Sequence, residues 1–316
     1  MNALALRAPA RVVARMQRRS LWTGGILVVL GIAFVIGLRI WVASGHENCP
    51  DGDTTRCGDG TYLPTYARSA TQTYLSGGGT ALLVLSVLIG VFVAGPLIAR
   101  ELESGTVRFA WAQSVSPARW LAARLALPAV LATAGVTVLV LVYRWGRSGV
   151  LGDSPYELSW SRSGVYPALG PVALAYALFA VALGALCAVL VRRTLPAMAL
   201  TAVVLGTVMY GFGKRRYELW PTARGLGHNP WPSGNAWPIE SGMLTASGKE
   251  LYWKDCFARG TAGPDCLKDQ GGVTSFVDYH QASHFWPLQL METGILLVLA
   301  AAATALAFRV LRRYHA

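Results

Sequence analysis

The residues that could carry out chemistry are sparse in this sequence, and the most suggestive set is a pair of histidines. His280 and His284 lie four residues apart, so they could share one face of a helix, and Asp278 is close by. Imidazole and carboxylate groups are common ligands of zinc, although two histidines at this spacing also occur often by accident. We therefore expect no metal ion and no cofactor at this position.

The common hydrolytic motifs are absent from the sequence. No phosphate-binding loop of the form GxxxxGK[ST] occurs, and the strings around Lys214 and Lys249 lack both the leading glycine and the hydroxyl residue. The HExxH motif of zinc proteases and the GxSxG motif of serine hydrolases are missing as well. We therefore expect no catalytic residues and no enzyme activity by these routes.

The composition indicates a membrane protein. Of the 316 residues, 53% are hydrophobic and only 14% are charged, whereas soluble domains carry about 25% charged residues. A net charge of +12 would suggest nucleic-acid binding in a soluble chain. Here the charges cluster at the ends of apolar runs, as expected for spans whose cytoplasmic flanks collect Lys and Arg. We therefore expect a lipid bilayer as partner, and no nucleic acid.

Six segments are long and apolar enough to cross a bilayer, which takes about 20 residues in helical form. They are Leu21–Ala43, Gly79–Ile98, Leu121–Tyr143, Pro171–Val191, Leu195–Gly213 and Phe285–Phe308. The first segment has the basic leader of a signal peptide, but its apolar stretch exceeds the usual 7–15 residues, which favours a retained span. In the fourth span, Ala180, Gly184 and Ala188 share one face, a pattern that allows close helix packing. The sequence therefore predicts an all-α integral membrane protein.

The distribution of charge predicts the orientation of these spans. With the N-terminus inside, the short inner pieces are rich in arginine, and the longer outer pieces hold nearly all the acidic residues. The inner pieces are residues 1–20, 99–120, 192–194 and 309–316. This asymmetry follows the positive-inside rule, so both termini are expected to be cytoplasmic. Ser116 followed by Pro117 predicts the start of the helix that becomes the third span.

The first twenty residues form a basic segment of their own. Arg7, Arg11, Arg15 and Arg18 fall on one side at helical spacing, with apolar residues elsewhere. A basic amphipathic helix of this kind lies on the inner leaflet, attracted by anionic lipid. We expect such an interfacial helix over residues 1–20, followed by the six-helix transmembrane domain over residues 21–316; the alternative is a disordered basic leader.

Two long outer loops are predicted, at residues 44–78 and 214–284. Four of the five cysteines lie in these loops, two in each: Cys49, Cys57, Cys256 and Cys266. Cysteines confined to the outer face suggest disulfides in an oxidising compartment. Short loops close most readily, which favours Cys49–Cys57 and Cys256–Cys266 over pairing between the loops. Zinc binding is the competing interpretation, but the CxxC spacing that it would need is absent.

Glu292 lies about two helical turns inside the last span. A carboxylate at that depth is costly unless it faces protein, water or an oppositely charged partner. One hypothesis is that Glu292 lines a substrate path or a proton site. The other is that it pairs near the outer interface with a cation of the large loop.

The loop between the second and third spans, residues 99–120, is the most informative part of the chain. Arg100 and Glu101 extend the second span into the cytosol, and Gly105 allows a sharp turn. The segment Thr106–Gln113 then carries three large apolar side chains: Val107, Phe109 and Trp111. This segment is too short to span the bilayer, so it either lies on the membrane or docks into a groove of a partner.

Three strings resemble the type-2 permease class of ATP-binding-cassette (ABC) exporters, in the form common in actinobacteria. They are GPLIARELESGTVRFAWAQSVSPARW, LVRRTLPAMALT and DYHQASHFWPLQLMETG, and together they reach across nearly the whole chain. The resemblance implies six helices per protomer, a second permease protomer, identical or different, and a separate ATP-binding subunit. It also implies an interfacial helix before the first span, and an external cap with a local disulfide before the last. The first outer loop is longer than the short hairpin usual in the class.

In this class the loop between spans two and three carries the helix that docks on the ATP-binding subunit. The resemblance therefore assigns this role to Arg100, Glu101, Gly105, Thr106, Val107, Phe109 and Trp111. The expected function is that of an efflux permease in the plasma membrane of a bacterium, moving an amphipathic drug, lipid or peptide. The alternative is a non-transporting sensor or accessory protein that binds a ligand or partner through its outer loops.

Overall fold

The structure is a computed structural model that describes residues 18–44, 66–107, 116–150, 158–232, 234–258 and 265–313. The chain divides into two compact units. The helical unit comprises Met1–Leu158, Arg162–Met209 and Thr293–Ala316, and the sheet unit comprises Ser159–Ser161 and Tyr210–Glu292. The predicted interfacial helix over residues 1–20 lies almost entirely outside the described residues.

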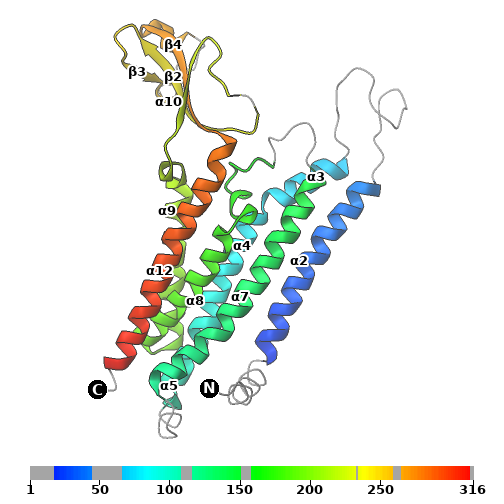
Figure 1. The fold of residues 1–316 in the computed structure, drawn as a ribbon, viewed down its shortest axis with the longest axis vertical. Coiled ribbons are helices and arrows are strands. Elements are labelled where there is room, and N and C mark those ends of the chain that lie inside the picture. The colour runs from blue at the N-terminus through cyan, green and yellow to red at the C-terminus, as the bar shows by residue number, and fades with distance from the viewer. Residues whose placement is uncertain are drawn as a thin grey trace. The chain divides into compact units, whose positions relative to one another are not determined.

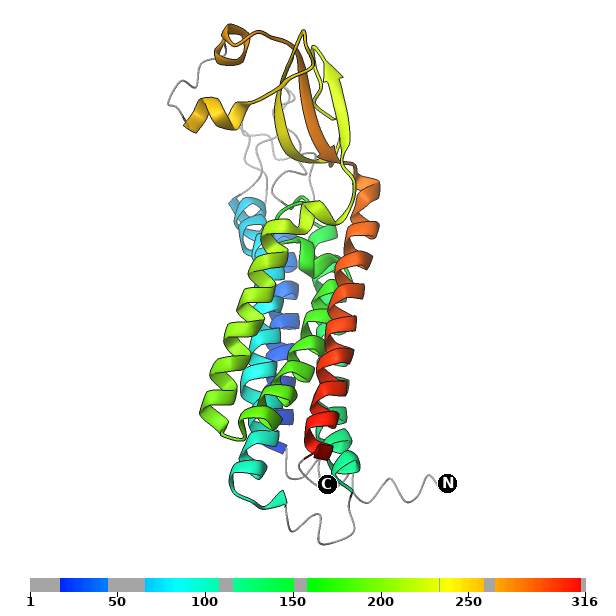
Figure 2. The same ribbon diagram turned by 90° about the vertical axis from the view of Figure 1, so that its left-hand side faces the viewer.

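Six helices in the described part of the chain are long and apolar enough to cross a membrane, as the sequence predicts (Figure 1). Five of these spans are α2 (Arg18–Ser44), α7 (Pro117–Ser148), α8 (Val172–Val191), α9 (Thr194–Arg215) and α12 (Phe285–Arg313). The second span is composite, with α3 (Tyr66–Ser76), α4 (Gly78–Leu88), η1 (Ile89–Ala94) and α5 (Gly95–Glu103) in succession. Figure 2 shows α9 and α12 as long, continuous helices.

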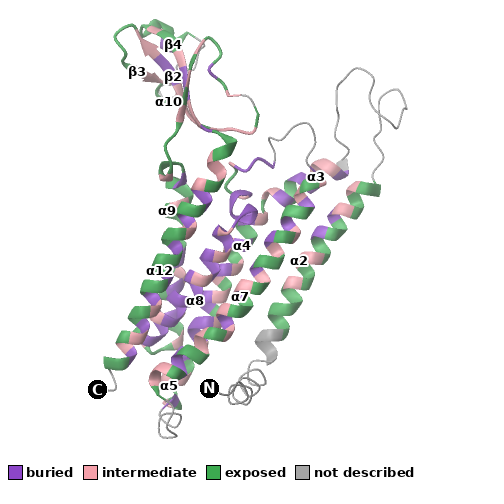
Figure 3. Cartoon of the chain, viewed as in Figure 1, coloured by how far each residue is buried: buried purple, intermediate pink, exposed green. Residues whose placement is uncertain are grey.

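Helix α8 forms the core of the helical unit (Figure 3). It packs against α4, η1, α5 and α7, and most of its residues are buried. A helix that is hydrophobic all round is expected to be buried on every side. By contrast, α2 exposes large apolar side chains such as Trp22, Leu30 and Ile40, as expected for a surface that meets lipid.

The second span changes its helical register at η1, which is a π-helix of six residues. Pro96 is the second residue after η1; it has no N–H to donate, and its ring disfavours ordinary α-helical packing against the preceding turn. The Gly95 N–H donates to the Gly90 carbonyl, five residues back, so the π register absorbs this interruption. A Cβ atom on Gly90 would lie 2.8 Å from the Ala180 carbonyl oxygen of α8, and one on Gly184 would lie 2.6 Å from the Gly90 carbonyl. The small residues of α8 therefore allow this close approach.

The sheet unit corrects the prediction of an all-α protein. Its four antiparallel strands are β1 (Ala223–Gly227), β2 (Trp237–Thr245), β3 (Glu250–Tyr252) and β4 (Gly272–His280), in the order β1-β4-β2-β3. The density of Gly and Pro in this segment favours loops locally. Cross-strand pairing overrides that preference, since what stabilises a strand is its neighbours rather than its own propensity.

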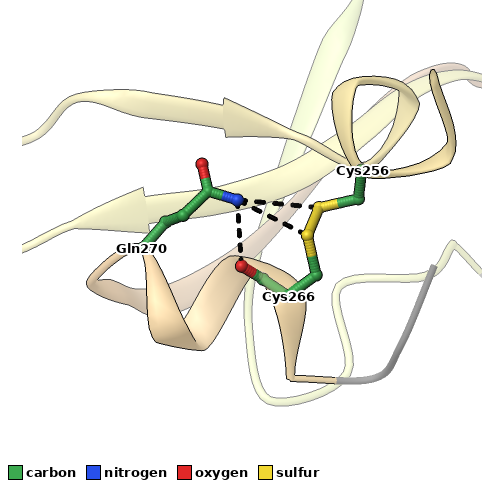
Figure 4. Close-up of a disulfide and its surroundings, with 3 residues drawn as sticks. All are labelled: Cys256, Cys266 and Gln270. Atoms are coloured by element: carbon green, nitrogen blue, oxygen red, sulfur yellow. Dashed lines mark hydrogen bonds between the residues drawn. A yellow bond between two sulfur atoms is a disulfide. The ribbon is translucent and has the colours of Figure 1, made fainter. Parts of the chain in front are cut away.

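A disulfide joins the two short helices that lie between β3 and β4 in the chain, α10 (Trp253–Ala258) and α11 (Cys266–Asp269) (Figure 4). It links Cys256 to Cys266, the local pairing that the sequence favours. The Gln270 side-chain nitrogen lies 3.0 Å from the Cys266 carbonyl oxygen, and Met243 and Leu267 pack with Cys256 in a small core. The other predicted disulfide, Cys49–Cys57, lies outside the described residues.

Candidate functional site

The candidate site is the end of α5, where two carboxylates follow each other on the last turn of the helix. Glu101 and Glu103 lie within Gly95–Glu103, close to the C-terminal Ser104. Acidic side chains are unfavourable at a helix C-terminus because the unpaired carbonyls there carry partial negative charge. These two carboxylates therefore gain stabilisation only from partners on other elements, and both have such partners.

Glu101 binds the first turns of α7. Its carboxylate accepts a hydrogen bond of 3.0 Å from the indole nitrogen of Trp120 and forms an ion pair with Arg124. Trp120 is buried, and the side chains of Glu101 and Arg124 keep only 23% and 13% of their surface exposed. Helix α7 begins as predicted, with the Ser116 side chain accepting from the Arg119 N–H and Pro117 in the first position.

Glu103 binds the start of α9. One of its oxygens accepts hydrogen bonds from the Thr194 backbone N–H at 2.9 Å and from the Thr194 hydroxyl at 2.6 Å. The first turn of α9 contains no acidic residue of its own. Glu103 therefore supplies from another helix the negative charge that the N-terminus of α9 favours. Two carboxylates two residues apart thus connect α5 to the beginnings of α7 and α9.

The turn after α5 depends on Gly105. Its φ is +69°, in the left-handed region, and a Cβ atom there would meet no other atom within 4 Å. The backbone conformation, rather than lack of space, therefore favours glycine. The Ser104 and Thr106 hydroxyls lie 2.9 Å apart in a hydrogen bond across this turn, and Val107 beyond it is buried.

The remaining residues assigned to docking are less constrained or lie outside the described part. Arg100 is exposed at the end of α5. Phe109 and Trp111 lie in residues 108–115, which are outside the described residues. The structure brings Glu101 together with Trp120 and Arg124, and this group, like the pair of Glu103 and Thr194, was not predicted from the sequence.

Glu292 is buried in the sheet unit and paired with an arginine. Arg216, the first residue of η3 (Arg216–Leu219), places Nε 2.7 Å from one Glu292 oxygen and Nη2 3.1 Å from the other. The Arg216 side chain is 5% exposed and the Glu292 side chain 0%. Such a two-pronged, charge-assisted pair satisfies both groups away from water. Of the two hypotheses for Glu292, pairing with a cation of the large loop is the one that this geometry supports.

The histidines considered as metal ligands have other contacts. His280 is fully buried, with one ring nitrogen 2.9 Å from the Tyr217 carbonyl oxygen and the other 3.2 Å from a ring nitrogen of His284. Burial lowers the pKa of His280, which favours the neutral form of its ring. Asp278 instead forms two hydrogen bonds of 2.7 Å with Arg224. In the part of the chain that the structure describes, no group of three or more His, Cys, Asp or Glu residues is placed to hold a metal ion.

Arg224 is the centre of a charged network on the surface of the sheet. It also reaches Glu250 at 2.5 Å, and Glu250 accepts a hydrogen bond from the Tyr252 hydroxyl. The hydrogen bond to Asp278 and the one to Glu250 raise the pKa of Arg224, and Tyr252 and Arg224 lower that of Glu250. The bond to Glu250 raises the pKa of Tyr252 to about 12. This network is satisfied internally and indicates a structural role.

The six spans define a multi-pass membrane protein whose two carboxylate contacts lie at one end of the helical unit. A comparison with protein families matches residues 24–215 to the family described as ABC-2 membrane transporter related. The chain belongs to this family, and it is therefore a multi-pass protein of the plasma membrane and a permease component of a transporter. The matched residues include Glu101, Glu103 and all their partners, and they end before the first strand of the sheet unit. Searches of curated proteins and of solved structures find no match.

Proposed function

We propose that this chain is the membrane-spanning subunit of an ABC exporter, driven by a separate ATP-binding subunit and paired with a second permease protomer. Both termini are cytoplasmic in this proposal, residues 1–20 lie on the inner leaflet, and the sheet unit is outside. The substrate is an amphipathic drug, lipid or peptide. The observation that carries the proposal is the pair of contacts from the end of α5, Glu101 to α7 and Glu103 to α9.

The ATP-binding subunit docks on the turn and the apolar segment beyond it, at Gly105, Thr106, Val107, Phe109 and Trp111. Docking displaces the end of α5 when the ATP-binding subunits close. Because Glu101 and Glu103 bind the first turns of α7 and α9, both helices receive the displacement at the same end. Hydrogen bonds to charged groups contribute about 1.5–3 kcal/mol when shielded from water and less when exposed. Contacts of this strength can pull on α7 and α9, and they can still break and re-form as the subunit moves.

Glu292 has a different role in this proposal. In the structure it is buried against Arg216 rather than exposed to a path. We infer that the pair holds η3 against α12, and that Glu292 meets substrate only in a state in which the pair has separated.

The experiment separates docking from transmission with two sets of variants. The chain is purified with its co-expressed ATP-binding subunit and reconstituted in proteoliposomes. Phe109→Ala with Trp111→Ala is expected to weaken retention of the ATP-binding subunit, since buried aromatic residues dominate most interfaces. Glu101→Gln with Glu103→Gln is expected to keep that subunit bound but to abolish the stimulation of its ATP hydrolysis by substrate.

Glu240→Gln is the matched control, because among the described residues this carboxylate forms an exposed ion pair with Lys254 on the sheet unit, away from α5. It is expected to bind and couple like the wild type. If the variant Glu101→Gln with Glu103→Gln also couples like the wild type, the two contacts do not transmit movement and the proposal loses its main support. If no ATP-binding subunit is retained by the wild type, the chain acts instead as a non-transporting sensor or accessory protein.

A further inference from the structure

The sheet unit contains a cavity of about 400 Å³ that the proposed function does not use. Its walls come from the segment before β2 and from the end of β4 and the turn after it. The lining residues are Pro230, Trp231, Pro232, Asn235, Ala236, Tyr279, Gln281 and Ala282. The volume falls in the range of small-molecule sites, which is about 300–1,000 Å³.

Contacts from elsewhere in the unit hold the wall of this cavity in place. The indole nitrogen of Trp160 donates to the Asn235 carbonyl at 2.7 Å, and the Ser159 hydroxyl lies 2.8 Å from the Asn235 side-chain oxygen. Gly225 of β1 approaches the Pro230 carbonyl so closely that a Cβ atom would clash with it. These contacts fix both ends of the wall, so a ligand would not have to order it.

Two aromatic residues line the cavity on segments whose backbone is restrained. Trp231 is 58% exposed and lies between Pro230 and Pro232, which restrict the backbone on both sides. Tyr279 belongs to β4 and is paired with Ala223 on one side and Pro238 on the other. An exposed tryptophan on a restrained segment offers a large contact area at a small cost in conformational entropy.

The chemistry of the lining selects a class of ligand. None of the lining residues is charged, although the chain as a whole carries a net charge of +12. A charged ligand would lose hydration here without gaining a partner of opposite charge. The Asn235 and Gln281 amides and the Tyr279 hydroxyl can donate and accept hydrogen bonds, which an acyl chain cannot use. Pyranose rings combine C–H faces that pack on aromatic rings with hydroxyl edges that donate and accept.

We propose that this cavity binds a neutral pyranose ring, presented either by a free or polymeric saccharide or by the headgroup of a glycolipid. Trp231 and Tyr279 provide the aromatic surfaces, and Asn235 and Gln281 provide the polar contacts. The proposal rests on the sheet unit alone and does not depend on transport.

The test uses the full chain in lipid nanodiscs and isothermal titration calorimetry. The probes are maltotriose, the trimer of N-acetylglucosamine, and a neutral glucosyl lipid incorporated into the nanodisc. Binding of either trisaccharide identifies a free or polymeric glycan as the source, and binding of the glucosyl lipid alone identifies a headgroup. Trp231→Ala should weaken binding roughly tenfold, corresponding to the loss of one aromatic contact of about 1.4 kcal/mol. Trp231→Phe should retain most of the affinity.

Trp220→Ala is the matched control, because Trp220 is also exposed and also precedes a proline, but does not line the cavity. It should bind like the wild type. The proposal is overturned if no saccharide probe binds the wild type, or if Trp231→Ala binds as tightly as Trp220→Ala. Binding of a polyproline peptide in place of the saccharides, lost in Trp231→Ala, would overturn it in favour of a peptide site.

Discussion

Glu101 and Glu292 are both paired with arginine, but their surroundings differ. Glu101 keeps 23% of its side-chain surface exposed and shares its charge between Arg124 and Trp120. Glu292 is fully buried and bound by two nitrogens of Arg216. Partly exposed pairs contribute little to stability because water competes for both charges. Removing one member of a buried pair is strongly destabilising, because the other charge stays buried without the group that it was bound to. The first arrangement is suited to movement, and the second to holding the chain fixed.

The largest effect is expected from breaking the buried pair. Glu292→Ala should destabilise the protein by about 3–5 kcal/mol, because the Arg216 guanidinium would remain buried without its carboxylate. The measurement is thermal unfolding of the purified protein, supported by the folded yield. The double variant Arg216→Met with Glu292→Leu should recover most of the loss, since it removes both charges together. If the double variant loses as much stability as Glu292→Ala, the buried charge of Arg216 is not the cause of the destabilisation.

The next effect concerns the disulfide of the sheet unit. Replacing both Cys256 and Cys266 with serine should destabilise this unit by about 2–3 kcal/mol in the chain-entropy model, given their separation of ten residues. Limited proteolysis should then cut the sheet unit faster, while substrate-stimulated ATP hydrolysis changes less than in the variant Glu101→Gln with Glu103→Gln. Equal rates of cleavage before and after the replacement would contradict this expectation.

A smaller effect on stability is expected at the turn after α5, together with weaker retention of the ATP-binding subunit. Gly105→Val should cost about 1–3 kcal/mol, because a branched residue is strained at a φ of +69°. Gly105→Asn should cost less, since asparagine tolerates the left-handed region. Gly206→Ala of α9 is the control, because a Cβ atom there meets nothing within 4 Å and its φ is not in the left-handed region. The measurement is thermal unfolding together with retention of the ATP-binding subunit. If Gly105→Val matches Gly206→Ala in both, the turn does not require glycine.

The smallest effect on stability is expected at the exposed contact to α9. Thr194→Ala removes the hydroxyl that donates to Glu103 but keeps the backbone N–H, so the melting temperature should stay within experimental error. Substrate-stimulated hydrolysis should nevertheless fall, and Thr194→Ser should restore it. A fall in melting temperature as large as that of Glu292→Ala would remove the distinction between the two kinds of contact.

The spans could be predicted from the sequence, because a bilayer requires long apolar runs that a single helix supplies by itself. The predicted second span began at Gly79, whereas the structure extends it back to Tyr66 through α3. The sequence of α3, YARSATQTYLS, is too polar to be detected by apolar length. Gly105 was predicted to allow a turn, and its positive φ confirms this.

The partners of Glu101, Glu103 and Glu292 could not be predicted in the same way. Each pair joins residues far apart in the chain, as with Glu103 and Thr194, and one sequence does not reveal which remote residues meet. A local signal did exist for Glu103, since a carboxylate at the C-terminus of a helix needs a partner elsewhere. The sheet was missed for a related reason, because β1 pairs with β4 about fifty residues later in the chain, as in Arg224 and Asp278.

The close approach of Gly90 and Gly184 has a mechanical consequence for the second span. It holds the span against α8 at η1, and α5 continues the packing on α8 beyond that point. From Gly90 to Glu101 the helix is roughly 16 Å long, at about 1.5 Å per residue. If this stretch tilts by about 7° together with the part of α8 on which it packs, Glu101 moves by roughly 2 Å, using the same rise. The bond from Trp120 to Glu101 is 3.0 Å long, and a shift of that size is sufficient to break it.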